Sequence, residues 1–71
     1  MSDTSGDAWV LYREGTRDFY VKTLADGPEV TRSVGKARLF NSVEAMHEWT
    51  VLSQWGYGKG FSIRPLTEFI V

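Results

Sequence analysis

Few side chains in this sequence of 71 residues have the type and spacing that catalysis or metal binding requires. There is one histidine, His47, and there is no cysteine, which excludes thiolate metal sites and disulfide bonds together. Glu44 and Glu48 stand four residues apart, a spacing that places two carboxylates on one face of a helix. No opposing groups of a hydrolase accompany them, and the serines lack a base with an orienting partner. The sequence therefore predicts no catalytic residue, no metal site and no cofactor, and hence a protein that is not an enzyme.

A glycine-rich stretch, "WGYGKGF" at residues 55–61, is the remaining candidate for chemistry, because glycine-rich loops can hold phosphate groups. Such loops follow a strand and open a helix, and their lysine is followed by Ser or Thr. Here the loop follows a helical pattern and opens a strand, and Gly60 follows Lys59. We therefore interpret it as a joint, in which Gly56 ends the helix in the left-handed conformation and Tyr57 comes next.

Length and composition limit the kind of protein further. A chain this short makes one domain with a small core. Residues 1–7 are small, polar and acidic, so we expect a disordered tail, followed by a single domain over residues 8–71. The start of the chain lacks the features of a signal peptide, and no apolar run is long enough to span a bilayer. Together with the absence of cysteine, these features predict a cytoplasmic protein without a membrane partner.

Aromatic and β-branched residues mark the strands of the predicted sheet. The first two strands cover residues 8–14 and 18–24, and a short turn that contains Gly15 joins them. A second turn follows at residues 25–29, where Pro28 cannot donate to a ladder. The apolar parity changes within the next run, residues 29–40, and a β-bulge at Gly35 would return its apolar side chains to one face. The alternative is two short strands that are joined at Gly35.

A single helix is predicted from Ser42 to about Trp55. Asn41 is its N-cap, and Glu44 three residues later completes a capping box. The face that should lie on the sheet consists of Ala45, Met46, Trp49 and Leu52. A neighbouring face consists of Glu44, Glu48, Val51 and Trp55. We therefore expect Trp55 to be more exposed than Trp49.

A last strand, "FSIRPL" at residues 61–66, completes the element order β-β-β-α-β. The expected fold class is α+β: an antiparallel β-meander with one helix packed on one face and a C-terminal strand. We expect the last strand to run in the same direction as the first and third strands. It can then lie beside the first strand, which gives the strand order 3-2-1-4.

The three Trp, three Tyr and four Phe exceed what one helix on a four-stranded sheet can hide, which predicts a protein–protein interaction module. One candidate partner-binding surface consists of Trp55, Tyr57, Lys59, Glu44 and Glu48, with Trp55 as the aromatic anchor. In the alternative interpretation, Trp55 covers the sheet edge as part of the core. The other candidate surface is the sheet face away from the helix, which no second layer would cover, with Tyr12, Tyr20 and Arg32. The excess of apolar surface also allows self-association.

A basic stretch supports a second hypothesis, a small nucleic-acid-binding domain. Arg32, Lys36 and Arg38 stand in a run without acidic residues from residue 30 to residue 38. The full candidate set adds the cations Lys59 and Arg64 and the rings of Tyr12, Phe19 and Tyr20, which could stack on bases. The net charge of −1 argues against strong nonspecific binding to polyanions. Nucleic-acid binding is therefore the alternative to protein binding.

Three stretches carry a resemblance to a known group of proteins: "FYVKTL", "GKARLFNSVEAMHEW" and "FSIRPL". Their succession over residues 19–66 resembles a recurring pattern among small phage-encoded accessory proteins that modulate the host or counter its defences. The resemblance implies a non-enzymatic protein of β-β-β-α-β type that acts in the host cytoplasm. It also implies an inhibitor or modulator that binds a host factor, such as a defence nuclease complex or RNA polymerase. It transfers no individual site residues.

Overall fold

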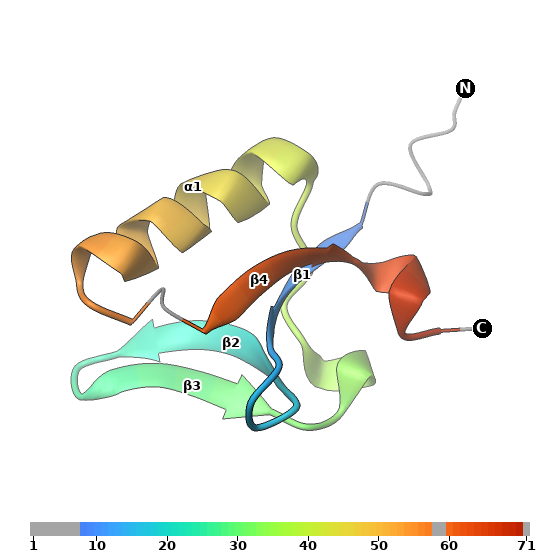
Figure 1. Ribbon diagram of the computed structural model, residues 1–71, viewed down its shortest axis with the longest axis horizontal. Helices are drawn as coiled ribbons and strands as arrows, with labels where there is room; N and C mark the ends of the chain where they lie inside the picture. Colours follow the sequence, from blue (N-terminus) through green and yellow to red (C-terminus); the bar gives the residue numbers. More distant parts are fainter. Residues whose placement is uncertain (1–7, 58–59, 71) are drawn as a thin grey trace.

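The computed structural model describes residues 8–57 and 60–70, which form an antiparallel sheet with one α-helix (Figure 1). The expected tail at residues 1–7 lies outside the described residues, as does Lys59. The elements are β1 (Trp9–Arg13), β2 (Asp18–Leu24), β3 (Gly27–Thr31), α1 (Ser42–Gln54) and β4 (Phe61–Pro65), with short 3₁₀ turns η2 (Val34–Lys36) and η3 (Leu66–Glu68). This element order confirms the predicted α+β fold class.

The strand order is β3-β2-β1-β4, as predicted, but the predicted direction of the last strand is wrong. β4 runs antiparallel to β1, so that Phe61 pairs with Arg13 and Pro65 pairs with Trp9. The reason lies in where the helix starts. Phe40, just before α1, pairs with Trp9 at the beginning of β1, so the helix carries the chain from that end of β1 to the other. The chain then enters β4 beside Arg13 and must run back.

The segment after β3 does not contain the predicted β-bulge. β3 ends at Thr31, and Gly35 lies inside the turn η2 instead of in a strand. The irregularity of the sheet is in β2, between Tyr20 and Lys22, where its register against β3 shifts. The alternative of two short strands joined at Gly35 is equally wrong, because a 3₁₀ turn occupies that position.

The chain then inserts between β1 and β2 at the end where these strands separate. The Arg38 N–H donates to the Tyr20 carbonyl of β2 at 3.2 Å. Phe40 and Trp9 of β1 exchange two backbone hydrogen bonds of 2.8 and 2.9 Å. Residues 38–40 therefore fill the middle of the sheet where β1 and β2 no longer pair.

Both ends of α1 agree with the sequence prediction. The Asn41 side chain accepts from the Glu44 N–H at 2.7 Å, and a Glu44 carboxylate oxygen accepts from the Asn41 N–H at 3.1 Å. At the other end Gly56 has a φ of 88°, and the Tyr57 N–H donates to the Leu52 carbonyl at 2.8 Å. These bonds form a capping box and a Schellman ending.

One face of the sheet packs against α1 and forms the helix-side core. Its buried members are Leu11, Tyr20, Phe40, Ala45, Leu52 and Phe61. Ala45 and Leu52 are buried and Trp49 is half-buried, as predicted, but Met46 is 58% exposed. Met46 lies about 100° around the helix from Ala45, on the side toward solvent and β4 rather than over the sheet.

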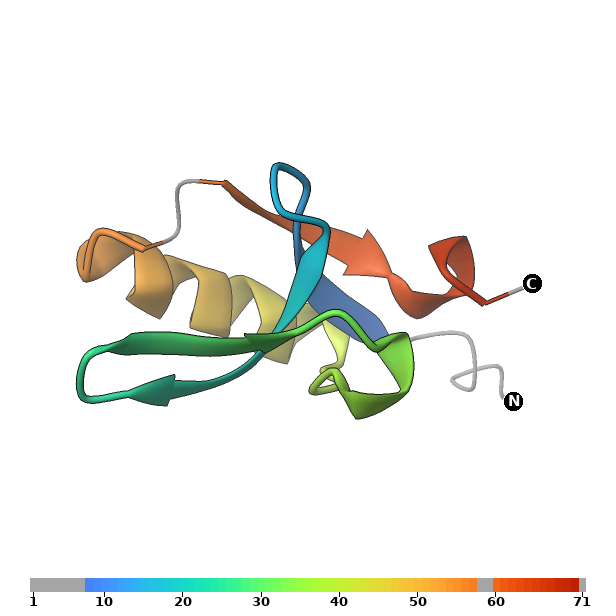
Figure 2. The same cartoon turned by 90° about the horizontal axis from the view of Figure 1, so that it is seen from below.

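The opposite face of the sheet is covered as well, which corrects the expectation of an open face. Val10, Phe19 and Ala37 form a second core there, and Tyr12, Val34, Leu66 and Phe69 pack against it. The cover comes from the turns η2 and η3, which Figure 2 shows at the end of the molecule away from the C-terminal end of α1. The second core accounts for apolar side chains on both faces of β1 and β2.

Candidate functional site

Tyr20, a predicted partner contact, is 1% exposed and belongs to the helix-side core. Its hydroxyl donates to Glu48 at 2.7 Å, and a second bond of 2.7 Å joins it to the hydroxyl of Thr23. Burial raises the pKa of Tyr20, and the hydrogen bond and negative charge of Glu48 raise it further. Tyr20 therefore links β2 to α1 and offers no surface to a partner.

Tyr12 lies on the other face, within the aromatic cluster of the second core. Its ring centroid is 5.2 Å from that of Phe19 and 4.8 Å from that of Phe69. Tyr12 is half-buried and packs against the second core, so it does not lie on an open sheet face.

Trp55 is the most exposed aromatic side chain of the described residues, at 61%. It is the C-cap of α1, directly before Gly56, where the helix ends. Trp49 is half-buried, and its indole N–H donates to the Phe61 carbonyl at 2.9 Å. The prediction that Trp55 is the more exposed of the two is confirmed, and Trp55 does not form a lid on the core.

Tyr57 is 38% exposed and turns toward the β2–β3 hairpin. A Cβ placed on Gly27 would lie 3.7–3.8 Å from the ring and hydroxyl of Tyr57, which shows that the ring rests on the backbone of Gly27. Tyr57 therefore holds the end of α1 to the start of β3. The side chain nevertheless stays partly accessible, two residues after Trp55 in the sequence.

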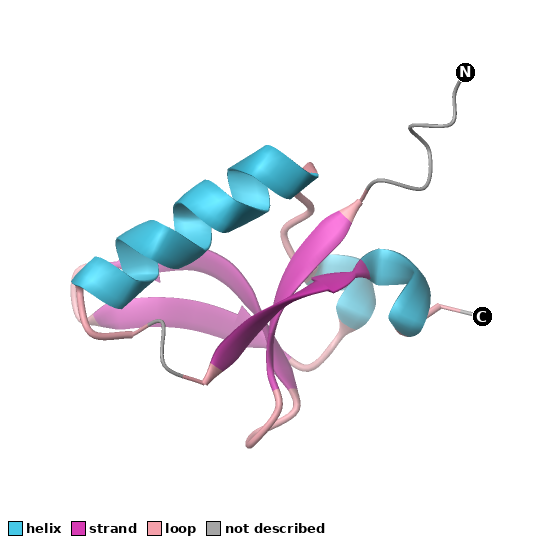
Figure 3. Cartoon of the chain, turned by 45° about the horizontal axis from the view of Figure 1, so that its top comes forward, coloured by secondary structure: helices cyan, strands magenta, loops and turns pink. Residues whose placement is uncertain are grey.

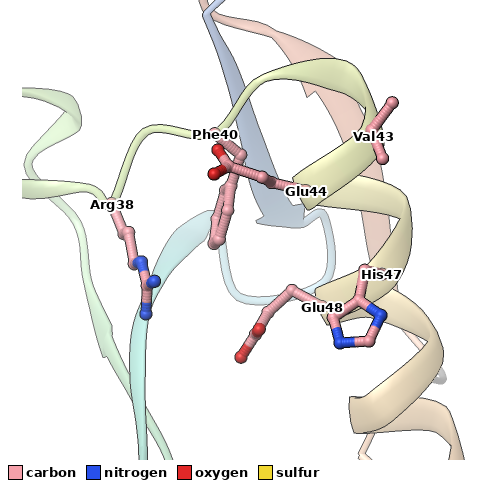
Figure 4. Close-up of a pocket in the computed structure, with 6 residues that line it drawn as sticks. All are labelled: Arg38, Phe40, Val43, Glu44, His47 and Glu48. Atoms are coloured by element: carbon pink, nitrogen blue, oxygen red, sulfur yellow. The ribbon is translucent and has the colours of Figure 1, made fainter.

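A hollow of about 340 Å³ lies on the flank of α1 that faces β2, and we call it the Phe40 hollow (Figure 4). It is lined by Arg38, Phe40, Val43, Glu44, His47 and Glu48. The guanidinium carbon of Arg38 is 5.1 Å from the centre of the Phe40 ring, a distance typical of a cation–π contact. Figure 4 shows Arg38 on one side of this ring and the two glutamates on the helix side.

The structure brings together Glu44 and Glu48, as the spacing predicted, and adds two residues that the sequence analysis did not place there. Arg38 and Phe40 come from the segment that was expected to be a strand. Phe40 directly precedes the N-cap Asn41, and it packs in the same core as Ala45, the fourth helical residue. This is the arrangement of a hydrophobic staple, and it was the signal that could have placed Phe40 beside the helix.

The cations of the nucleic-acid hypothesis have different surroundings. Arg38 turns toward α1 and the Phe40 hollow, whereas the charge of Arg32 acts on the carboxylate of Asp18 at the β1–β2 end. Arg64 forms ion pairs with Glu68 at 3.1 Å and with Glu14 at 4.0 Å. Arg64 is thus partly neutralised and Arg38 already lies against the Phe40 ring, which weakens the case for a phosphate-binding surface.

Asp18 is a buried charge that the sequence analysis did not single out. It is 6% exposed, and Arg13 donates to both of its oxygens, at 3.0 and 2.9 Å. Burial alone would raise the pKa of Asp18, but hydrogen bonds from Arg13 and Thr16 and the charges of Arg13 and Arg32 lower it below its usual range. The pair closes the β1–β2 turn, and its two members are already bonded to each other.

Residues 8–57 and 60–70 contain no group of three His, Cys, Asp or Glu side chains that could hold a metal ion. In the same part of the chain, no helix combines the length and the hydropathy needed to cross a membrane. Comparison with known proteins adds no assignment: no protein-family model matches the chain, and neither the curated proteins nor the solved structures include a significant match.

Proposed function

We propose that this chain is a non-enzymatic protein-binding module whose partner contacts the flank of α1 that carries Glu44, Glu48, Val51 and Trp55. The observation that supports this most strongly is the 61% exposure of Trp55. Eight of the ten aromatic side chains are buried or half-buried; only Trp55 and Tyr57 are exposed, and they are adjacent at the end of α1. Exposed Trp and Tyr side chains are the residues that most often anchor protein interfaces.

The Phe40 hollow supplies the second contact of the proposed interface. From Glu44 to Trp55 the helix rises by about 16 Å, so one partner segment can reach both the hollow and the Trp55 ring. The hollow has two carboxylates and one guanidinium around an aromatic floor. Its charge favours a partner that presents a basic side chain there, while Trp55 packs against an apolar surface of the partner.

The identity of the partner enters this proposal only through the resemblance to phage accessory proteins. On that basis the partner is a host complex, such as a defence nuclease complex or RNA polymerase, and the chain acts on it as an inhibitor or modulator in the cytoplasm. The residues proposed here do not depend on that identity.

The test is affinity capture from a bacterial lysate with the wild type, Trp55→Ala and Ile70→Ala. Ile70 is a matched control, because it is 51% exposed and follows the turn η3, which Figure 1 shows at the opposite end of the molecule from the C-terminal end of α1. We expect Trp55→Ala to lose the captured partner, with circular dichroism and thermal unfolding unchanged, and Ile70→Ala to retain it. Tyr57 is not included in the variant, because its packing on Gly27 would confound binding with stability.

Two outcomes would contradict the proposal. A folded Trp55→Ala variant that still captures the partner would place the interface elsewhere. A partner that is lost when the lysate is treated with nuclease would favour the nucleic-acid alternative, and Arg32, Lys36 and Arg38 would then be the residues to substitute.

A further inference from the structure

The outer edge of β4 has a backbone pattern that can be worked out from its register with β1. The Leu66 N–H donates to the Ala8 carbonyl at 2.8 Å, which makes residues 8 and 66 a hydrogen-bonded pair. Hydrogen-bonded pairs alternate along an antiparallel ladder, so Arg64 and Ser62 also bond to β1. The backbone groups of Phe61, Ile63 and Pro65 therefore point outward, away from β1. The hydrogen bonds of Trp9 to Phe40, on the opposite side of β1, agree with this alternation.

These outward groups are not all alike. The Phe61 carbonyl already accepts from the Trp49 indole. Pro65 has a carbonyl but no N–H to donate. Ile63 presents both an N–H and a carbonyl, and no residue of the described chain bonds to either. The edge therefore offers a donor and an acceptor at Ile63, a donor at Phe61 and an acceptor at Pro65.

We propose that this edge pairs with the same edge of a second copy of the chain, antiparallel and centred on Ile63. In that register Ile63 faces Ile63 of the second copy, and the two exchange both of their free hydrogen bonds. Phe61 faces Pro65 of the second copy and donates to its carbonyl. The Phe61 carbonyl would then face a proline that cannot donate, and it is the one edge acceptor that Trp49 already satisfies. In this register every outward N–H and carbonyl of residues 61–65 has a hydrogen-bond partner.

The side chains beside this edge suit a two-fold symmetric contact. Two shallow hollows meet at Met46: one is lined by Trp49, Phe61, Ser62 and Ile63, and the other by Ser42, Val43 and His47. Val43 is 76% exposed and Met46 is 58% exposed. The second copy would place its own helix on the same face of the joined sheet, beside α1, and would cover both side chains.

Charge also permits this arrangement. A symmetric interface brings each surface against itself, so like charges near its centre would repel. No Asp, Glu, Lys or Arg side chain is among those that line the two hollows. The glutamates of α1 lie on the other flank, in the Phe40 hollow. On the opposite sheet face, Arg64 would meet the small neutral Ser62 of the second copy, and Glu68 partly neutralises Arg64. This surface borders the one proposed for partner binding, because Val43 and His47 line both the Phe40 hollow and one of these two hollows.

The first test changes the charge opposite Arg64. We expect sedimentation equilibrium of the full chain to show a dimer whose dissociation constant Ser62→Lys raises at least about tenfold, because two symmetric like-charge pairs form. Ser62→Glu is the matched control, and it should leave the dimer as strong as the wild type or stronger. Ser62 is half-exposed, and circular dichroism would verify that both variants fold.

The second test reads the register directly. Ile63→Cys would place two thiols across a hydrogen-bonded pair, with Cα atoms about 5.5 Å apart, within the range that a disulfide spans. The chain has no other cysteine, so we expect rapid oxidation to a covalent dimer. Lys36→Cys, an exposed position in η2, is the control and should cross-link slowly.

Three results would overturn the proposal. A wild type that stays monomeric at every concentration would mean that Trp49 and Pro65 protect the edge from pairing. Equal dissociation constants for Ser62→Lys and Ser62→Glu, or equal cross-linking at positions 63 and 36, would place any dimer contact on another surface. If Ile63→Cys failed to fold, the two Ser62 variants would decide alone.

Discussion

At the scale of single residues, two buried polar groups make the stability of this small domain depend on pH. Asp18 is a buried carboxylate paired with the Arg13 guanidinium, and Tyr20 is a phenol held between Glu48 and Thr23. Their pKa values shift in opposite directions, downward for Asp18 and upward for Tyr20. The first group therefore loses its stabilising effect in acid and the second in alkali.

Asp18→Asn should lower the free energy of unfolding at neutral pH by about 2 kcal/mol, because the amide can accept only one of the two hydrogen bonds from Arg13 and carries no negative charge. The stabilisation from the lowered pKa is complete above the unfolded pKa of about 3.9 and is lost as pH falls through the folded value. Chemical denaturation of both proteins from neutral to strongly acid pH measures this. The difference between them should shrink in acid; a constant difference would show that the ion pair does not set the pKa.

Tyr20→Phe should cost about 1 kcal/mol at neutral pH, because Glu48 and Thr23 lose a hydrogen-bond partner but can reach water. Since the folded pKa is raised, the wild type loses stability once pH exceeds the unfolded value of about 10. The variant lacks this group, so its curve of unfolding free energy against pH should fall less steeply there. Parallel curves would mean that the Tyr20 hydroxyl is not protected by the fold.

At the scale of the elements, the sequence predicted the structure correctly where it depends on neighbouring residues. It did not do so where the structure depends on contacts between residues far apart in the chain. Asn41, Glu44 and Gly56 determine both ends of α1 through bonds within a few residues. By contrast, the course of residues 32–40 depends on where β1 and β2 separate, because Arg38 bonds to Tyr20 and Phe40 bonds to Trp9, which both lie much earlier in the chain. The predicted direction of β4 was wrong for the same reason. If the third strand continued to Phe40, the helix would start at the opposite end of the sheet from the one where the structure has it.

Gly56→Ala should destabilise the fold by roughly 1–2 kcal/mol, because an L-residue resists a φ of 88°. A Cβ at Gly56 would meet nothing within 4 Å, so the cost is purely conformational. Gly15→Ala is the matched control: it also meets nothing within 4 Å, and the φ of Gly15 is not positive. Thermal unfolding should show a lower midpoint for Gly56→Ala alone. Equal midpoints would contradict the role of Gly56 in ending α1.

At the scale of the whole molecule, one sheet separates two cores of different make-up (Figure 3). The helix covers one face, and two short turns cover the other. Trp55 was predictable as a surface residue because helical spacing alone moves it off the core stripe. The Phe40 hollow was not predictable, because Arg38 and Phe40 on one side of it belong to residues 38–40, which insert between β1 and β2. The number of aromatic side chains predicted an exposed binding surface, whereas five of the ten pack in the helix-side core and three in the second core.

The insertion of residues 38–40 between β1 and β2 also has a consequence for how the domain assembles. The middle of the sheet is complete only when residues far apart in the sequence meet, because Trp9 bonds there to Phe40 and Tyr20 bonds to Arg38. The β1–β2 hairpin, formed first on its own, would leave those backbone groups bonded only to water. We therefore expect the chain to fold in one cooperative step that waits for the slow closure of a long loop, without a stable intermediate built from a single hairpin.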